Sequence, residues 1–238
     1  MTLLQCSGLD FGYSKAFTDP FDFSLDAGQV VALMGRNGSG KSSLLKTLAG
    51  INPSLDGSLE ILGTQVKNWS ARELAKRVAY ISISKAAPDR MTVREFVSLG
   101  RMPYSGLFDG RNAQDEKIID DAISLMELEC YETRFVNELS DGERSRVYLA
   151  EAVAQQVKVL LLDEPNAFLD IPWSHALFRT LRQLAEEREM GIVVSTHSLE
   201  YASKYCNRFL VVANGEVNIG SLEEVEKQGG LDWINENA

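Results

Sequence analysis

Short apolar runs alternate along the chain with longer segments in which apolar residues recur at helical spacing. The runs VVALMG (30–35), VKVLLLDEP (157–165) and GIVVST (191–196) are apolar at nearly every position, which predicts strands buried on both faces. Residues 42–50, after the first run, and residues 174–189, between the other two, have helical composition. This alternation of strand and helix predicts a parallel sheet covered by helices.

Two parts of the chain depart from that alternation. The first ~30 residues and residues 57–63 have the short strands and turn residues of a small antiparallel layer. Between Pro88 and Gln156 the pattern is mostly helical and interrupts the rhythm of strands. The helical stretches there are residues 92–100, 113–128 and 142–156.

We therefore expect one α/β domain over residues 1–238, with a helical subdomain inserted into it. Residues of about 1–87 and 157–238 would form the core, together with the antiparallel layer, and residues of about 88–156 the insertion. The last segment, 221–238, is too short for a separate regulatory domain and is expected to form terminal helices.

A glycine-rich loop follows the first predicted strand. GRNGSGKSS (35–43) matches the pattern G-x-x-x-x-G-K-[ST], with a strand before it and a helix after it. Glycines let the backbone curl so that its amides point at phosphate oxygens, and the helix adds its positive N-terminal end. Lys41 is then expected to reach the β- and γ-phosphates of a nucleotide, and the Ser42 hydroxyl to bind Mg²⁺. The alternative is an ordinary turn rich in glycine and serine. The strand before the loop, the helix after it and the exact match to the pattern disfavour this alternative.

A pair of acids ends the second predicted strand. Asp163 and Glu164 follow four apolar residues and so lie at the carboxyl edge of the sheet, where α/β sheets bind ligands. Asp163 is expected to hold Mg²⁺, directly or through water, and Glu164 to orient the attacking water. Two acids after a strand are a weak signal alone, but the phosphate loop about 120 residues upstream strengthens it.

Composition narrows the class of protein. The formal charge of −10 disfavours nonspecific nucleic-acid binding, and we expect no nucleic-acid partner. The three cysteines show no paired spacing and only two histidines are present, so a zinc site is not expected and a reducing compartment fits. No apolar run approaches the roughly 18 residues of a membrane span, and the N-terminus lacks the pattern of a secretory signal.

Together these motifs resemble the ATP-binding subunit of ABC (ATP-binding cassette) transporters over nearly the whole chain. Besides the loop and the acid pair, LSDGE (139–143) resembles the family's L-S-G-G-Q signature, and AFLD (167–170) its S-A-L-D loop. His197 in VVSTHS matches the family's switch histidine, and Tyr13 in FGY the aromatic that stacks on adenine. Taken alone, Tyr13 is better explained as a half-buried strand residue, and His197 is equally well explained as a capping or core residue. The similarity of ELAKRVAYIS and MTVREFVSLGRMPY extends to the ATPases of iron-siderophore, heme and cobalamin importers.

The resemblance implies a P-loop NTPase (RecA-like) fold and an ATPase with ATP and Mg²⁺ as ligands. It implies a second copy of the chain, with two ATP molecules held head to tail, so that Ser140 and Gly142 of one copy contact the ATP of the other. The expected catalytic residues are Glu164, His197 and Lys41, and the expected metal ligands are Ser42 and Asp163. The expected nucleotide-binding residues are Tyr13, Gly35, Asn37, Gly38, Ser39, Gly40, Lys41, Ser42, Ser43, Ser140, Gly142 and Asp170.

The signature departs from the family at Asp141 and Glu143. Ser140 and Glu143 have the spacing of a capping box, and acids suit the first turn of a helix, so local physics explains both acids without a ligand. A carboxylate ~6 Å from a phosphate charge would cost roughly 3 kcal/mol at an effective dielectric of ~20. We therefore expect the Asp141 side chain to turn away from the nucleotide, with Arg144 or Arg146 offsetting its charge.

A second departure concerns the glutamine that the family carries after the strand equivalent to VAYIS. By spacing Ile83 falls at that position and cannot bind a metal, although Ser82 or Ser84 could substitute for the glutamine. In the family this glutamine senses the membrane partner, so its replacement puts the coupling to that partner in doubt.

The expected function is the ATPase subunit of an importer, at the cytoplasmic face of the membrane. Its partners would be an integral membrane permease and, indirectly, a substrate-binding protein. GRMPYSGLF (100–108) offers apolar anchors for the permease, but it could equally pack on its own subdomain. An ABC ATPase without a permease, as in iron–sulfur assembly, is the alternative, and a degenerate nucleotide-binding regulator is a third possibility.

Overall fold

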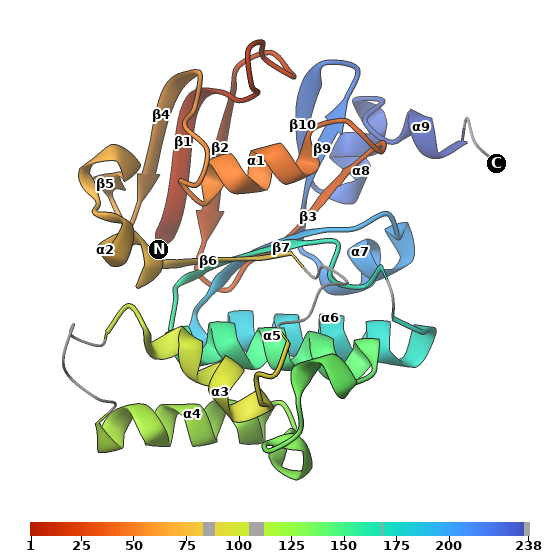
Figure 1. The fold of residues 1–238 in the computed structure, drawn as a ribbon. Coiled ribbons are helices and arrows are strands. Elements are labelled where there is room, and N and C mark those ends of the chain that lie inside the picture. The colour runs from red at the N-terminus through yellow and green to blue at the C-terminus, as the bar shows by residue number, and fades with distance from the viewer. Residues whose placement is uncertain (83–88, 105–111, 168, 236–238) are drawn as a thin grey trace.

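The computed structural model describes residues 1–82, 89–104, 112–167 and 169–235, which form two sheets with helices between and below them (Figure 1). The larger sheet has six strands in the order β10-β9-β3-β8-β7-β6. Strands β3, β6, β7, β8 and β9 run parallel, and β10 is antiparallel to β9. The bounds are β3 Val30–Gly35, β6 Val78–Ser82, β7 Val159–Asp163, β8 Gly191–Ser195, β9 Arg208–Ala213 and β10 Glu216–Gly220.

The smaller sheet is the antiparallel layer expected near the N-terminus, and its strand order is β2-β1-β4-β5. Its bounds are β1 Thr2–Asp10, β2 Phe21–Asp26, β4 Asp56–Ile61 and β5 Thr64–Gln65. Helix α1 (Lys41–Leu48) lies between the two sheets (Figure 1). Its leucines pack in one core with apolar side chains from β1, β2, β3, β7 and β8, so this helix joins the two layers.

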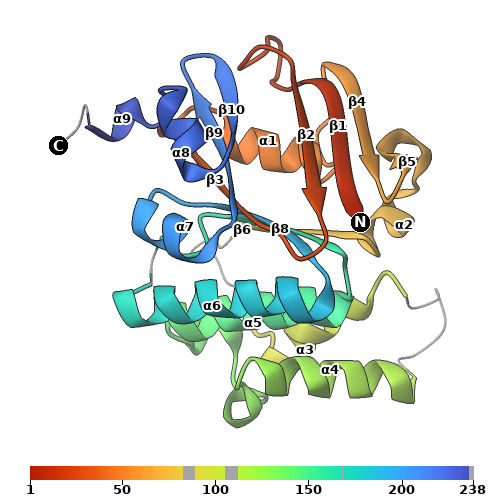
Figure 2. The same ribbon diagram turned by 180° about the vertical axis from the view of Figure 1, so that it is seen from behind.

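The other face of the large sheet is covered by α5 (Asp141–Gln155) and α6 (Ile171–Arg188) (Figure 2). Helices α3 (Val93–Ser98) and α4 (Ala113–Leu125) pack beyond α5. Side chains of α3, α4 and α5 share one continuous core with β7, β8 and α6. The helices between β6 and β7 are therefore held to the sheet by α5.

Helices α7 (Leu199–Tyr205) and α8 (Leu222–Lys227) pack in a third core with β3 and β9. The remaining helices are α2 (Ala71–Ala75) beside the small sheet and α9 (Asp232–Asn235) near the C-terminus (Figure 1). Short 3₁₀ turns lie at Val66–Asn68, Leu99–Arg101, Glu129–Tyr131 and Val136–Glu138. In the described part of the chain, no helix is both long enough and apolar enough to cross a membrane.

The strand–helix alternation, the antiparallel layer, the helices between β6 and β7 and the terminal helices predicted from sequence are all confirmed. The predicted start of α6 at residue 174 was wrong by three residues. The Asp170 side chain accepts from the Trp173 amide at 2.9 Å and caps the helix, and Pro172 occupies its first turn. Proline is favoured there because the first amides of a helix have no intrahelical partner.

Candidate active site

The glycine-rich loop connects β3 to α1, as its sequence predicted. Gly40 has a φ of 98°, and a β-carbon there would lie 2.8 Å from the Phe17 ring. A β-carbon on Gly35 would lie 2.5 Å from the Val212 carbonyl oxygen. Both positions therefore require glycine, and the loop is packed closely between its neighbours while Asn37 and Gly38 stay exposed.

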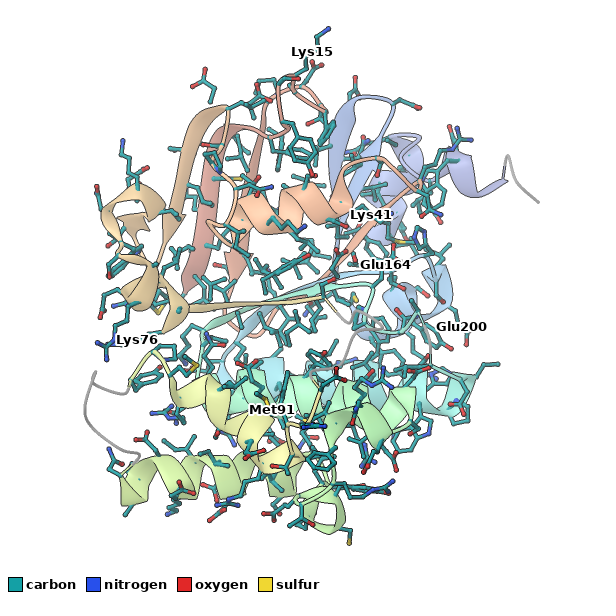
Figure 3. All side chains as sticks on the ribbon, in the orientation of Figure 1. Lys15, Lys41, Lys76, Met91, Glu164 and Glu200 are labelled. Carbon is teal, nitrogen blue, oxygen red and sulfur yellow. The ribbon has the colours of Figure 1, made fainter. Side chains whose placement is uncertain are left out.

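Lys41 directs its ammonium group back across this loop. Its Nζ donates to the carbonyl oxygens of Gly35 at 2.9 Å and Arg36 at 3.2 Å, and it lies 3.9 Å from Glu164 Oε1 (Figure 3). Burial lowers the pKa of Lys41, while the charges of Glu164 and Asp163 oppose that shift. The loop thus holds the buried ammonium group of Lys41 at the carboxyl edge of the sheet, where Asp163 ends β7 and Glu164 follows it.

Several hydroxyl groups lie in or beside the glycine-rich loop. The Ser39 hydroxyl is buried and has no hydrogen-bond partner among the described residues, so a ligand oxygen in the loop would satisfy it. Ser42 is exposed at the start of α1, and Ser43 Oγ donates to the Tyr13 hydroxyl at 3.3 Å. Tyr13 is 71% exposed, and its ring lies nearly perpendicular to that of Phe17, with 5.7 Å between the centroids. Amides, a cation, a free hydroxyl and an open ring together fit a nucleotide.

The two carboxylates lie at the end of β7 as expected, and the strands on either side hold them. Asp163 accepts from Ser195 Oγ at 2.9 Å and from the Tyr80 hydroxyl at 3.2 Å. Glu164 has a φ of 48°, a left-handed conformation that is strained for a non-glycine residue, and its amide donates to Ser195 Oγ at 2.7 Å. Burial, followed by the charge of Asp163, raises the pKa of Tyr80 to about 12, so its phenol keeps its proton at neutral pH.

His197 follows β8 and lies beside Glu164. Its Nε2 is 2.8 Å from Glu164 Oε1, and both side chains are 39% exposed. Lys41 and His197 thus both approach the same carboxylate oxygen of Glu164. The fold brings together the four residues Lys41, Asp163, Glu164 and His197, which come from three separate segments of the chain.

The signature residues form a second group, on the opposite face of the sheet from α1 (Figure 1). Ser140 caps α5 in a capping box: its hydroxyl accepts from the Glu143 amide at 3.3 Å, and the Glu143 carboxylate accepts from the Ser140 amide at 2.8 Å. Burial raises the pKa of Glu143, but its hydrogen bonds from Ser140 and Tyr131 outweigh burial and leave that pKa below its ordinary value. The capping box predicted from the sequence is therefore present.

The Asp141 side chain is 54% exposed and lies 3.5 Å from the Arg144 guanidinium. Arg144 is one of the two arginines expected to offset its charge. The other, Arg146, instead donates to the carbonyls of Met126 and Glu127.

Sequence reasoning missed three side chains of these two groups. Trp173 lies against Gly142, where a β-carbon on that glycine would be 3.3 Å from the indole, and it packs under the Arg146 guanidinium. Trp173 thus connects the signature glycine to the helix that Asp170 caps. Tyr80 and Ser195 hold Asp163, and the only sequence signal for them is a polar residue near the end of a buried strand. Ile83 and Ser84, where the family glutamine was sought, lie outside the described residues, as does Phe168 in the AFLD segment.

Comparisons with known proteins agree with this arrangement. The family model for ABC transporters matches residues 18–167. The petrobactin import ATP-binding protein of Bacillus anthracis is 36% identical over 223 residues, covering 93% of this chain and 82% of that protein. The hemin import ATP-binding protein of Streptomyces coelicolor is 37% identical over 217 residues, covering 91% and 76%.

A solved ATP-binding subunit of an ABC transporter superposes with a TM-score of 0.81 at 29% identity, covering 96% of this chain and 94% of that one. These three matches each cover at least 91% of this chain and at least 76% of the relative. This chain belongs to the ABC transporter family, as an ATP-binding subunit with ATPase activity.

Proposed function

We propose that this chain energises import of an iron-siderophore, heme or cobalamin-type substrate through a separate membrane permease. The convergence of Lys41 and His197 on the Glu164 carboxylate, beside Asp163, is the observation that supports hydrolysis most directly. The names of the petrobactin and hemin relatives support import of metal-chelate substrates. The sequence similarity extends the substrate class to cobalamin.

In this mechanism the loop amides and Lys41 hold the phosphates of ATP, and the exposed Tyr13 ring stacks on adenine. Ser42 and Asp163 would hold Mg²⁺, which when bound neutralises phosphate charge. Glu164 orients the attacking water and accepts its proton, because its carboxylate is open to solvent yet fixed by His197. His197 holds that carboxylate in place and reaches the γ-phosphate.

The proposed working unit is a pair of chains in head-to-tail contact. Ser140 and Gly142 lie at the start of α5, which covers the face of the sheet opposite α1 (Figure 1), and a second copy would bring its signature to each phosphate loop. Each chain is then one ATPase domain, with residues of about 1–87 and 157–238 as its core and 88–156 as its helical subdomain. Closure of the pair on ATP and its opening after hydrolysis would drive the permease from the cytoplasmic face of the membrane.

A groove of about 730 Å³ beside α2 offers a surface for that permease. It is lined by apolar side chains that include Ile51, Leu59, Val66, Leu74 and Val78. Ile51 is 58% exposed, and Tyr80, which also lines the groove, donates its hydroxyl to Asp163. A permease segment seated in this groove would therefore contact a side chain bonded to the proposed metal ligand.

The segment GRMPYSGLF borders the same surface as far as it is described. The Arg72 guanidinium on α2 donates to the Pro103 carbonyl at 2.8 Å, and Met102 is 66% exposed. Tyr104 is instead bound to its own helices, because its hydroxyl donates to the Gln155 carbonyl at 2.9 Å. Residues 105–108 lie outside the described residues. Met102 is thus the described residue of this segment best suited to anchor a partner.

An iron–sulfur assembly ATPase would share the nucleotide site but would co-purify with soluble partners instead of an integral membrane protein. A nucleotide-binding regulator would bind ATP without hydrolysing it. The retention of Lys41, Asp163, Glu164 and His197 in one cluster favours the hydrolysing enzyme.

Size-exclusion chromatography of Glu164→Gln with and without MgATP tests the head-to-tail pair. Removing the carboxylate that positions water should trap the ATP-bound pair, so the variant is expected to elute as a dimer only with MgATP. Lys41→Ala is the control and should remain monomeric. Nucleotide binding by Glu164→Gln without any shift would show that Asp141 or the replaced glutamine prevents closure in the absence of a permease.

A further inference from the structure

Each oxygen of the Asp163 carboxylate accepts one hydroxyl hydrogen bond. Ser195 Oγ donates to Oδ1 at 2.9 Å, and the Tyr80 hydroxyl donates to Oδ2 at 3.2 Å. The strand order β8-β7-β6 places β7, which ends at Asp163, between the two strands that carry these donors. The carboxylate is thus bonded from both neighbouring strands.

Ser195 also holds the next residue. Its Oγ accepts from the Glu164 amide at 2.7 Å while donating to Asp163, so one hydroxyl is bonded to both members of the acid pair. Ser195 is fully buried, with 0% exposure, so bulk solvent does not reach this bridge. Because the hydroxyl of Ser195 has a single proton, its two bonds require the donor and acceptor roles observed here.

The bridge coincides with the strained point of the backbone. Glu164 has a φ of 48°, and a non-glycine residue holds such a conformation only where its surroundings fix it. The conformation turns the chain sharply after β7 and aims the Glu164 side chain at His197, 2.8 Å away. The hydrogen bond from the Glu164 amide to Ser195 fixes this turn, together with the weaker bond from the Ala167 amide to the Glu164 carbonyl at 3.2 Å.

We propose that Tyr80 and Ser195 are positioning residues for hydrolysis: together they fix the Asp163 carboxylate for the metal, and Ser195 alone also fixes the turn that presents Glu164. This inference rests on the proposed function, since it assigns Mg²⁺ to Asp163 and the attacking water to Glu164. A carboxylate with both oxygens already oriented loses little freedom when a metal binds. Deleting either hydroxyl should therefore weaken the metal-bound state more than the metal-free state.

The test compares Tyr80→Phe and Ser195→Ala, each of which removes one oxygen atom, with wild type. The binding constant of a fluorescent ADP analogue is measured by titration with saturating Mg²⁺ and again with EDTA. Hydrogen bonds to charged groups contribute enough for roughly a tenfold loss of the Mg²⁺-dependent gain in affinity in each variant, with affinity in EDTA unchanged. Tyr205→Phe is the matched control, because it removes a hydroxyl bonded to His175 at 3.0 Å, away from the carboxylates.

The ATPase rate separates the two roles. Ser195→Ala should lower kcat at saturating Mg²⁺ by a further factor of roughly ten relative to Tyr80→Phe, because only Ser195 fixes the Glu164 turn. Equal kcat in the two variants would contradict the second role of Ser195. A lower melting temperature with the Mg²⁺ dependence of wild type in both variants would show that the hydroxyls only stabilise the fold, and would overturn the proposal.

Failure of the proposed function would look different. An iron–sulfur assembly ATPase would keep the Mg²⁺ dependence and the hydrolysis but would not bind a membrane subunit. A nucleotide-binding regulator would show no hydrolysis in wild type. Should Ser195→Ala fail to fold, Tyr80→Phe still decides the metal-positioning role, because Tyr80 is only half-buried and its ring is retained.

Discussion

Asp141 replaces a glycine of the family signature L-S-G-G-Q, and its carboxylate lies at the surface of the molecule. Its side chain is 54% exposed and lies 3.5 Å from Arg144, a pairing worth less than about 1 kcal/mol at such exposure. The functional contacts expected of the signature involve the Ser140 hydroxyl and the Gly142 amide. Neither contact needs the Asp141 carboxylate.

The substitution Asp141→Gly should therefore leave ATPase activity within about threefold of wild type. The Ser140–Glu143 capping box, which starts α5, is untouched by the change. The measurement is steady-state ATP hydrolysis at several salt concentrations, since salt screens exposed charges. A large gain in activity that disappears at high salt would instead show that the carboxylate faces the γ-phosphate.

At the residue scale, the sequence alone identified the functional residues that belong to a local motif with fixed spacing. Lys41, Ser42, Asp163 and Glu164 follow from the loop pattern and from acids after a buried strand. Tyr80, Trp173 and Ser195 do not, because each acts on a residue far away in the chain. Strand order and side-chain direction decide those contacts, and neither can be read from one segment alone.

At the scale of elements, a buried ion pair ties α4 to the end of α5. Arg101 Nε lies 2.8 Å from Asp115 Oδ1, with side-chain exposures of 5% and 7%. The same guanidinium donates to the Ala154 carbonyl at 2.8 Å and stacks on Tyr104, with 3.9 Å to the ring centroid. These contacts fix the helices between β6 and β7 to the part of α5 that packs on the sheet.

Asp115→Asn is expected to lower the free energy of unfolding by roughly 3 kcal/mol, because it removes the negative charge of a buried ion pair with Arg101. Chemical denaturation measures the loss. The control is Asp120→Asn, which removes an acid 59% exposed from an ion pair with Arg94 and should cost less than about 1 kcal/mol. Equal losses in the two variants would show that burial does not set the strength of this pair.

Hydrophobic spacing predicted the type of the longer helices and strands but was less successful with their ends. Helix α6 begins at Ile171 because Asp170 caps it, a role hidden in a segment that otherwise matched the family's S-A-L-D loop. The shared core of α5, β7 and α6 was also not apparent, since residues 142–156 were assigned to the inserted helical block. The start of α6 and this shared core both depend on contacts that the spacing of hydrophobic residues within one segment does not reveal.

At the scale of the whole molecule, the proposed function assigns partners to two surfaces: the face with the signature and the groove beside α2. The proposed second copy covers the first. For the second, the groove and the segment with Met102 both adjoin α2, since Leu74 of that helix lines the groove and Arg72 bonds to Pro103. A permease segment across α2 would reach both at once.

Ile51→Glu should therefore weaken binding to the membrane subunit while leaving nucleotide binding unchanged. Ile51 lines the groove at 58% exposure, so the new charge is hydrated in the free chain and becomes buried only when a partner covers it. Burying an unpaired charge costs several kcal/mol, which predicts at least a hundredfold loss of affinity for detergent-solubilised membrane subunit co-purified with wild type. Gln228→Glu adds the same charge at the exposed end of α8, far from α2 (Figure 1), and should bind like wild type. Undiminished binding by Ile51→Glu combined with loss in Met102→Glu would move the docking surface from the groove to the segment with Met102.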